Sequence, residues 1–204
     1  MAEVARDFFA VAEELILRIN RHVRQRLESL ELVAPTYAVA LSPLDDIYPL
    51  WLAVGLEPDR ERALASSSPL IAFSSVWQQD EFAIVEELDE DETIAELITR
   101  FAPELNMPEV ADGLDATQFV LYNVARRLTV ERPSWPVTDD FAVFAAYTGD
   151  IADFLLDSLR YSLTPELADR LRAKQLHPDN YERWVDEWLE TKRSDQQDAD
   201  GQHH

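Results

Sequence analysis

The run from Phe141 to Tyr147 constrains the fold of this chain more than any other stretch. Every residue in it is apolar, and the turn residues Asp139-Asp140 and Thr148-Gly149-Asp150 bound it, so its length suits a β-strand. Strand alternation gives it two apolar faces, formed by Phe141, Val143, Ala145 and Tyr147 and by Ala142, Phe144 and Ala146. We therefore expect other elements to cover both faces.

Two helices are predicted directly after this strand. Ile151, Phe154 and Leu155 begin an apolar helical face. Thr164 is a favourable N-cap with proline at the first helical position, which predicts a helix over 164–174. The turn between strand and first helix has one glycine, and Asp150 would repel an anion there. We interpret this turn as structural and not as a phosphate site.

Composition indicates a single folded domain. The chain has 204 residues, of which 47% are hydrophobic, which is ample for a core. We expect one α+β domain over residues 1–193 and a disordered polar tail over 194–204. There is no cysteine, which excludes disulfides, thiolate zinc sites and cysteine nucleophiles. The apolar runs are short, and acids stand where a signal peptide has bases, so we expect a cytoplasmic protein without membrane association.

The net charge of −22, from 40 acids and 18 bases, has three explanations. It favours solubility, it fits a salt-adapted protein in which lysine is scarce (Lys174 and Lys192 alone), or it attracts a basic protein such as a toxin. Direct binding to a nucleic-acid backbone is disfavoured at this charge. The composition does not choose among the three explanations.

A long amphipathic helix over 4–30 carries the one basic concentration, which includes Arg18, Arg21 and Arg24. It is a candidate surface for an anion or an acidic substrate. The alternative, which we favour, is that these arginines form ion pairs within the fold.

Alternating apolar residues predict an antiparallel hairpin from strands 36–41 and 50–56. Tyr37 is expected to share a face with Val39 and Leu41. The small residues of the other face suggest a closely packed helix, perhaps the first one. Further elements are predicted from periodicity and caps: helices 58–65, 93–101 and 115–131, a strand at 82–85, a linker at 103–108 and a last helix from Pro178.

Two further segments have alternative interpretations. Glu86 to Glu92 holds six acids in seven residues, but it lacks the glycine and the spacing of a calcium loop, so we interpret it as a solvated turn. Tyr181, Trp184 and Trp188 form an aromatic stripe on the last helix. Such a stripe binds a partner or, more commonly, docks on the core.

Known catalytic and cofactor patterns are missing from the sequence. The four glycines fit neither a dinucleotide fingerprint nor a P-loop, and no histidine pattern typical of a metal site occurs, so no cofactor or metal is expected. Asp46 and Asp140 remain as candidates for acid/base catalysis, which requires two carboxyl groups facing each other across a cleft. The alternative is that both are ordinary turn residues.

Four segments carry a family resemblance: Tyr37-Ala-Val-Ala-Leu41, Leu52–Ala63, Thr138-Asp-Asp-Phe-Ala-Val-Phe144, and Leu163-Thr-Pro-Glu-Leu167 with Lys174-Gln-Leu176. In these segments the chain resembles an acidic bacterial family of about 200 residues, known as a domain of unknown function. That resemblance supplies no catalytic residues. In size and acidity the chain is also similar to immunity proteins of bacterial toxin systems, which is an analogy only.

The predicted fold is thus a single α+β domain with a small, mostly antiparallel sheet and five to seven helices. Two functional hypotheses follow. The first is a non-enzymatic, acidic interaction module, immunity-like in character, that binds a basic protein. The second is an enzyme with a carboxylate-based acid/base site at Asp46 and Asp140. The identity of a partner or substrate and the oligomeric state are left open.

Overall fold

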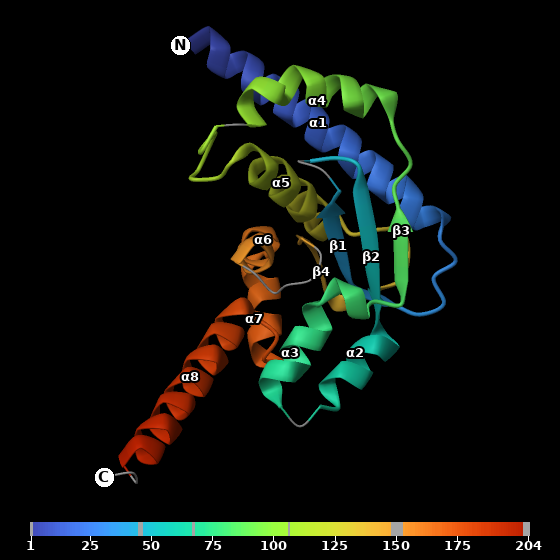
Figure 1. Cartoon of the computed structure of the whole chain (residues 1–204). Coiled ribbons are helices and arrows are strands. Elements are labelled where there is room, and N and C mark those ends of the chain that lie inside the picture. Colours follow the sequence, from blue (N-terminus) through green and yellow to red (C-terminus); the bar gives the residue numbers. More distant parts are fainter. Residues whose placement is uncertain (1, 45–46, 67, 106, 148–152, 202–204) are drawn as a thin grey trace.

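The computed structural model describes residues 2–44, 47–66, 68–105, 107–147 and 153–201, without the side chains of residues 2–7, 192 and 194–201. This part of the chain is an α+β fold with one four-stranded sheet (Figure 1). In chain order the elements are α1 (Ala2–Ser29), β1 (Thr36–Pro43), β2 (Leu50–Leu56), α2 (Glu57–Leu64), α3 (Pro69–Trp77), the 3₁₀ turn η1 (Gln79–Glu81), β3 (Ile84–Glu87), α4 (Glu92–Leu105), α5 (Ala116–Val130), β4 (Val137–Ala145), α6 (Asp153–Ser162), α7 (Pro165–Ala173) and α8 (Pro178–Gly201).

The sheet is mixed, which corrects the prediction of a mostly antiparallel one. Its strand order is β3-β2-β1-β4. The strands β1 and β2 form the predicted antiparallel hairpin, β3 adds antiparallel to β2, and β4 pairs parallel to β1. A parallel pair needs a long crossover, and here all elements from β2 to α5 lie between the two strands. The hairpin has a local sequence signature, whereas the direction of β4 does not.

Eight α-helices occur within the described residues, more than the five to seven expected, because α3 was not predicted. In the sequence, Ser66 and Pro69 are typical of a break after a helix. Ser68 in fact accepts a hydrogen bond from the N–H of Ile71, and Pro69 occupies the first turn of α3. The residues that end one helix therefore begin another.

Several predicted boundaries also changed. β3 lies two residues later than the predicted strand 82–85, and α4 continues through Pro103, which was assigned to a linker. β4 begins at Val137, so Asp139 and Asp140 lie within the strand and not in a preceding turn. The predicted capping box at Asp115 and the Thr164 cap of α7 are confirmed.

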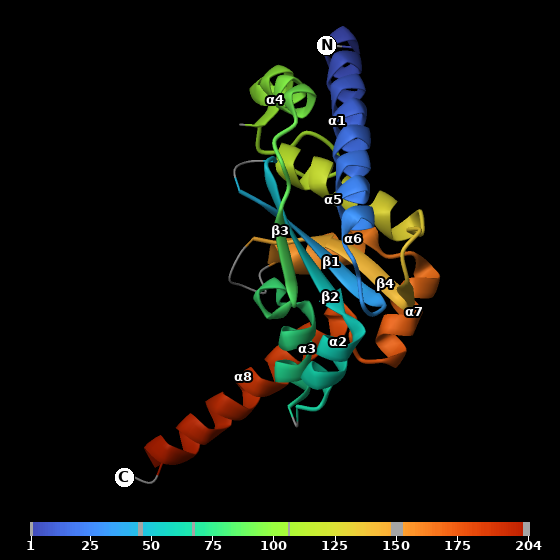
Figure 2. The ribbon, with the colours of Figure 1, turned by 90° about the vertical axis from the view of Figure 1, so that its right-hand side faces the viewer.

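Each face of the sheet is covered by its own hydrophobic core. On one face, Val39, Leu52 and Val143 contact the core that α1, α4 and α5 complete. On the other, the small residues of β1 and β2 share a core with apolar residues of α3, α6 and α7. The ribbons of Figures 1 and 2 show where these helices lie. The prediction that α1 packs on the small residues is therefore wrong. Their short side chains make room for the large rings of Phe73 and Trp77 in α3.

The last helix, α8, projects away from the rest of the fold (Figures 1 and 2). Near its start, Tyr181 and Trp184 lie against Phe73 of α3, with ring centroids 5.1 and 6.3 Å from it. Helical backbone continues to Gly201, beyond the expected domain end at residue 193. No helix among the described residues is both long and apolar enough to cross a membrane.

Tyr37 lies on the opposite face of the sheet from the one predicted. The pairing register of β1 with β2 shifts between Thr36 and Ala38, so two successive side chains, Tyr37 and Ala38, reach the core beneath α3. Gly55 of β2 leaves room for the phenol ring: a Cβ at this position would lie 2.7 Å from ring carbons of Tyr37. The Tyr37 hydroxyl donates a hydrogen bond of 2.8 Å to the Val76 carbonyl oxygen.

We expect Gly55→Ala to lower the free energy of unfolding by about 1–3 kcal/mol, because the added methyl group overpacks the core against the Tyr37 ring. Urea denaturation of the wild-type protein and the variant measures this change. In a Tyr37→Leu background the cost of the alanine should shrink, since the ring is gone. An equal cost in both backgrounds would show that the ring is not the cause.

Candidate functional site

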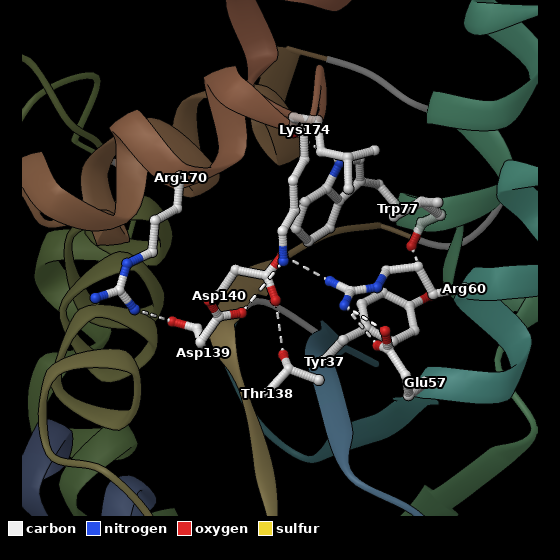
Figure 3. A network of polar contacts seen from close by, with 11 residues as sticks. Tyr37, Glu57, Arg60, Trp77, Thr138, Asp139, Asp140, Arg170 and Lys174 are labelled. Atoms are coloured by element: carbon white, nitrogen blue, oxygen red, sulfur yellow. Dashed lines mark hydrogen bonds and ion pairs between the residues drawn. The ribbon is translucent and has the colours of Figure 1, made fainter.

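The most densely charged buried site surrounds Asp140. β1 advances only from Thr36 to Ala38 while β4 advances from Val137 to Ala142, so the intervening residues of β4 depart from the regular ladder. This irregularity carries Asp140 into the space between the sheet, α2 and the end of α7 (Figure 3). Its residue surface is only 1% exposed, and a buried carboxylate requires charged or hydrogen-bonding partners.

Both oxygens of Asp140 have such partners. Oδ2 accepts hydrogen bonds from Arg60 Nη1 at 2.7 Å and from Lys174 Nζ at 2.9 Å. Oδ1 accepts one from the Thr138 hydroxyl at 2.8 Å. We call Asp140, Arg60, Lys174, Thr138, Glu57 and Asp139 the Asp140 cluster.

Arg60 lies at the centre of this cluster. Its Nη2 is 2.6 Å from a carboxylate oxygen of Glu57, one turn earlier in α2. The guanidinium carbon lies 5.2 Å from the ring centroid of Tyr37, a cation–π contact. Arg60 is only 5% exposed, although it belongs to a short helix rich in charged residues. Asp140 and Glu57 balance its buried charge.

Asp139 and the end of α7 form the outer part of the site. Lys174 Nζ also lies 3.2 Å from Asp139 Oδ1, and Arg170 donates to the Asp139 carbonyl oxygen (Figure 3). Beyond the charges, Trp77 Nε1 donates to the Leu176 carbonyl oxygen at 3.1 Å. The cluster and this bond connect α2, α3, β4 and the segment that follows α7.

The pKa values of Asp140 and Lys174 are shifted in the directions that favour their charged forms. Burial alone would raise the pKa of Asp140, but the hydrogen bonds from Arg60, Lys174 and Thr138 outweigh it and lower this pKa to about 2. Burial would likewise lower the pKa of Lys174, yet the hydrogen bonds to Asp140 and Asp139 raise it. A general acid or base works best with a pKa near the operating pH. The arrangement therefore has the chemistry of a structural clamp.

Asp46, the proposed catalytic partner of Asp140, lies outside the described residues. The pairing of these two carboxyl groups therefore stays a prediction. Among the described residues, no group of three or more histidine, aspartate and glutamate side chains is arranged to hold a metal ion.

A cavity of about 180 Å³ lies beside the Asp140 cluster, between β4, the end of α5 and the start of α7. Arg132 and Arg170 line it together with Asp139 and Glu166. Charges of both signs in so small a space select neither an anion nor a cation, and we assign no ligand to it.

Several basic residues of α1 form ion pairs. Arg18 lies 3.1 Å from Glu14, and Arg24 lies 3.1 Å from Glu131 at the end of α5. Arg21 is exposed. Two of the three arginines proposed as an interaction surface are thus compensated by carboxylates within the fold.

The aromatic stripe of α8 is divided between core and solvent. Tyr181 and Trp184 pack on the core beneath α3. Trp188, one turn further on, is 52% exposed. The stripe therefore docks α8 on the fold at its start and leaves one tryptophan accessible.

Exposed acids gather between β3 and α4. Glu87, Asp89, Glu90 and Glu92 are exposed, and no ion pair reaches them from the described part of the chain. Their neighbours are engaged: Glu86 pairs with Arg26, and Asp91 accepts the N–H of Ile94 at the start of α4. We call Glu87, Asp89, Glu90 and Glu92, together with β3, the acidic edge.

Searches of protein-family models, curated proteins and solved structures found no match to this chain. The resemblance to a bacterial domain-of-unknown-function family accordingly stays a prediction.

We expect Asp140→Asn to destabilise the fold by about 3–5 kcal/mol, because it leaves Arg60 buried beside an uncharged partner. Chemical denaturation measures the loss. Asp139→Asn is the matched control: its side chain is 66% exposed, so its pair with Lys174 should contribute less than about 1 kcal/mol. Equal effects of the two substitutions would contradict a clamp centred on Asp140.

The lowered pKa of Asp140 also predicts a pH dependence. The folded state holds this carboxyl ionised down to about pH 2, whereas the unfolded chain binds a proton near 3.8. The resulting stability is present above the unfolded value and is lost as the pH falls towards 2, a loss of about 2 kcal/mol. The stability difference between wild type and Asp140→Asn should therefore narrow between pH 5 and pH 2. A constant difference would show that Asp140 does not titrate in this way.

Proposed function

We propose that this chain is a non-enzymatic, acidic interaction module that binds a basic protein partner through its acidic edge. A toxin is one such partner, by analogy with immunity proteins of similar size and acidity. The observation that carries the proposal is the contrast between compensated bases and uncompensated acids on the described surface.

Many basic side chains are neutralised within the fold. The described ion pairs include those of Arg18, Arg24, Arg26, Arg60, Arg62, Arg127, Arg160, Arg172, Lys174 and Arg183. Exposed acids remain in excess, since the chain carries 40 acids against 18 bases. At the acidic edge, four exposed acids lie within the six residues from Glu87 to Glu92. Counter-charge for this segment must come from solution or from a partner.

Such a concentration of negative charge attracts a positively charged protein. Exposed charges raise association rates and orient the two proteins as they approach. At 0.1 M salt, the attraction between exposed charges is largely screened beyond about 10 Å. Apolar side chains adjoin the acids: Trp51 and Val85 are 37% and 54% exposed. An aromatic residue beside a charged rim is typical of a binding surface.

The Asp140 cluster supports a non-enzymatic function on separate grounds. Its carboxylate is buried and has both oxygens bonded, and its lysine is held in the charged form. Neither group is suited to exchange protons with a substrate near neutral pH.

Capture of partners from the native lysate tests this function. The full chain is immobilised at low salt, eluted with a salt step, and the eluate is identified by mass spectrometry. We expect a basic protein to bind the wild type and to be lost from a variant with Glu87→Gln, Asp89→Asn, Glu90→Gln and Glu92→Gln.

The matched control removes the same charge elsewhere, with Glu31→Gln, Glu61→Gln, Asp80→Asn and Asp186→Asn at exposed positions. This variant should retain the partner. If both variants lose it equally, overall charge and not the acidic edge governs binding. If the wild type captures no basic protein, the proposed function is wrong.

A further inference from the structure

β3 is an open edge of the sheet. Among the described strands it pairs only with β2, in the order β3-β2-β1-β4, and in Figure 2 it is the strand nearest the viewer, with no helix in front of it. Edge strands present unpaired backbone groups on which another strand can add. Short length and charged residues are the usual protection against this, and β3 has both.

The pairing with β2 determines which backbone groups are free. Leu88 N–H donates to the Leu50 carbonyl oxygen at 2.9 Å, immediately after β3. Hydrogen-bonded pairs alternate along an antiparallel ladder, so Ile84 and Glu86 bond to β2. The N–H and C=O groups of Val85 and Glu87 consequently face outward, and among the described residues no hydrogen bond reaches them.

The side chains beside these free groups form a mixed surface. Val85 and Glu87 lie on the same face as Ala53 and Trp51, which they oppose in β2. The exposed parts of Trp51 and Val85 give this face an apolar strip, and Glu87 and Asp89 stand at its end. An added strand would therefore contact free backbone groups of β3, an apolar strip and carboxylates.

We propose that the acidic edge binds its partner by strand addition: an extended segment, with lysine or arginine alternating with apolar residues, pairs with β3 and extends the sheet. This inference rests on the proposed function and specifies how the same surface acts. Acids protect this edge against other acidic strands, including a second copy of the chain, because like charges brought together across two strands are destabilising. They attract a basic strand instead.

A synthetic peptide tests this mode directly. The probe is an end-capped, eight-residue peptide in which lysine and valine alternate, and the protein is the full chain labelled for NMR. On binding, we expect amide hydrogen exchange of Val85 and Glu87 to slow by about tenfold or more. The amides of Ile84 and Glu86, already bonded to β2, should change less. Binding without slower exchange at Val85 and Glu87 would overturn strand addition.

Two methylated peptides of identical charge supply the matched control. N-methylation of the valines, or of the lysines, removes the backbone donors that point to one side of the peptide strand. One set should weaken binding by about tenfold or more, and the other should bind like the parent peptide. For antiparallel addition the harmful set is the one whose side chains lie on the face of Val85 and Glu87, since residues opposite these two have N–H groups directed at β3. Equal binding by both methylated peptides would overturn the proposal.

The outcomes separate this inference from the proposed function. Both methylated peptides could bind the wild type equally, while the variant neutralised at the acidic edge loses peptide binding. That pair of results would leave a charge-driven interaction module without strand addition. In the free protein, the amides of Val85 and Glu87 could instead be protected from exchange, with a protection that increases with protein concentration. That result would show a second copy on this edge and would also overturn the inference.

Discussion

A carboxylate shielded from water holds three distant segments of this chain in place. Asp140 is ionised where ionisation is unfavourable, and this is tolerated because Arg60, Lys174 and Thr138 supply hydrogen bonds from fixed positions. Each partner is therefore constrained in turn: Arg60 sets the position of α2, and Lys174 that of the end of α7. The second core, with Tyr37 under the Arg60 guanidinium, is assembled around this arrangement.

Charge has two different roles in the two parts of the molecule. In the Asp140 cluster, opposite charges are matched within hydrogen-bonding distance around a buried carboxylate, so they specify structure. At the acidic edge, Glu87, Asp89, Glu90 and Glu92 are exposed and form no ion pair within the described part of the chain, so their charge is not balanced there. The strongly negative composition hides this division, because a net charge does not show which acids are already compensated.

Features with a local cause could be predicted from the sequence. The hairpin, the capping box at Asp115, the Thr164 cap and the two apolar faces of β4 all depend on residues close together in the chain. The direction of β4, the helix α3 and the burial of Asp140 could not be predicted. The pair Asp139-Asp140 is typical of a turn, and it is Arg60, 80 residues earlier, and Lys174, 34 residues later, that make the second aspartate a buried anion. The open edge at β3 likewise depends on strand order, which no local pattern specifies.

The parallel pairing of β1 with β4 also determines the order in which the chain can reach this structure. The β1–β2 hairpin closes a short loop and loses little chain entropy, whereas β4 must return across all elements from β2 to α5. The attraction between Arg60 and Asp140 becomes effective only after that long loop has closed. The clamp that stabilises the finished fold therefore contributes only after that loop has closed.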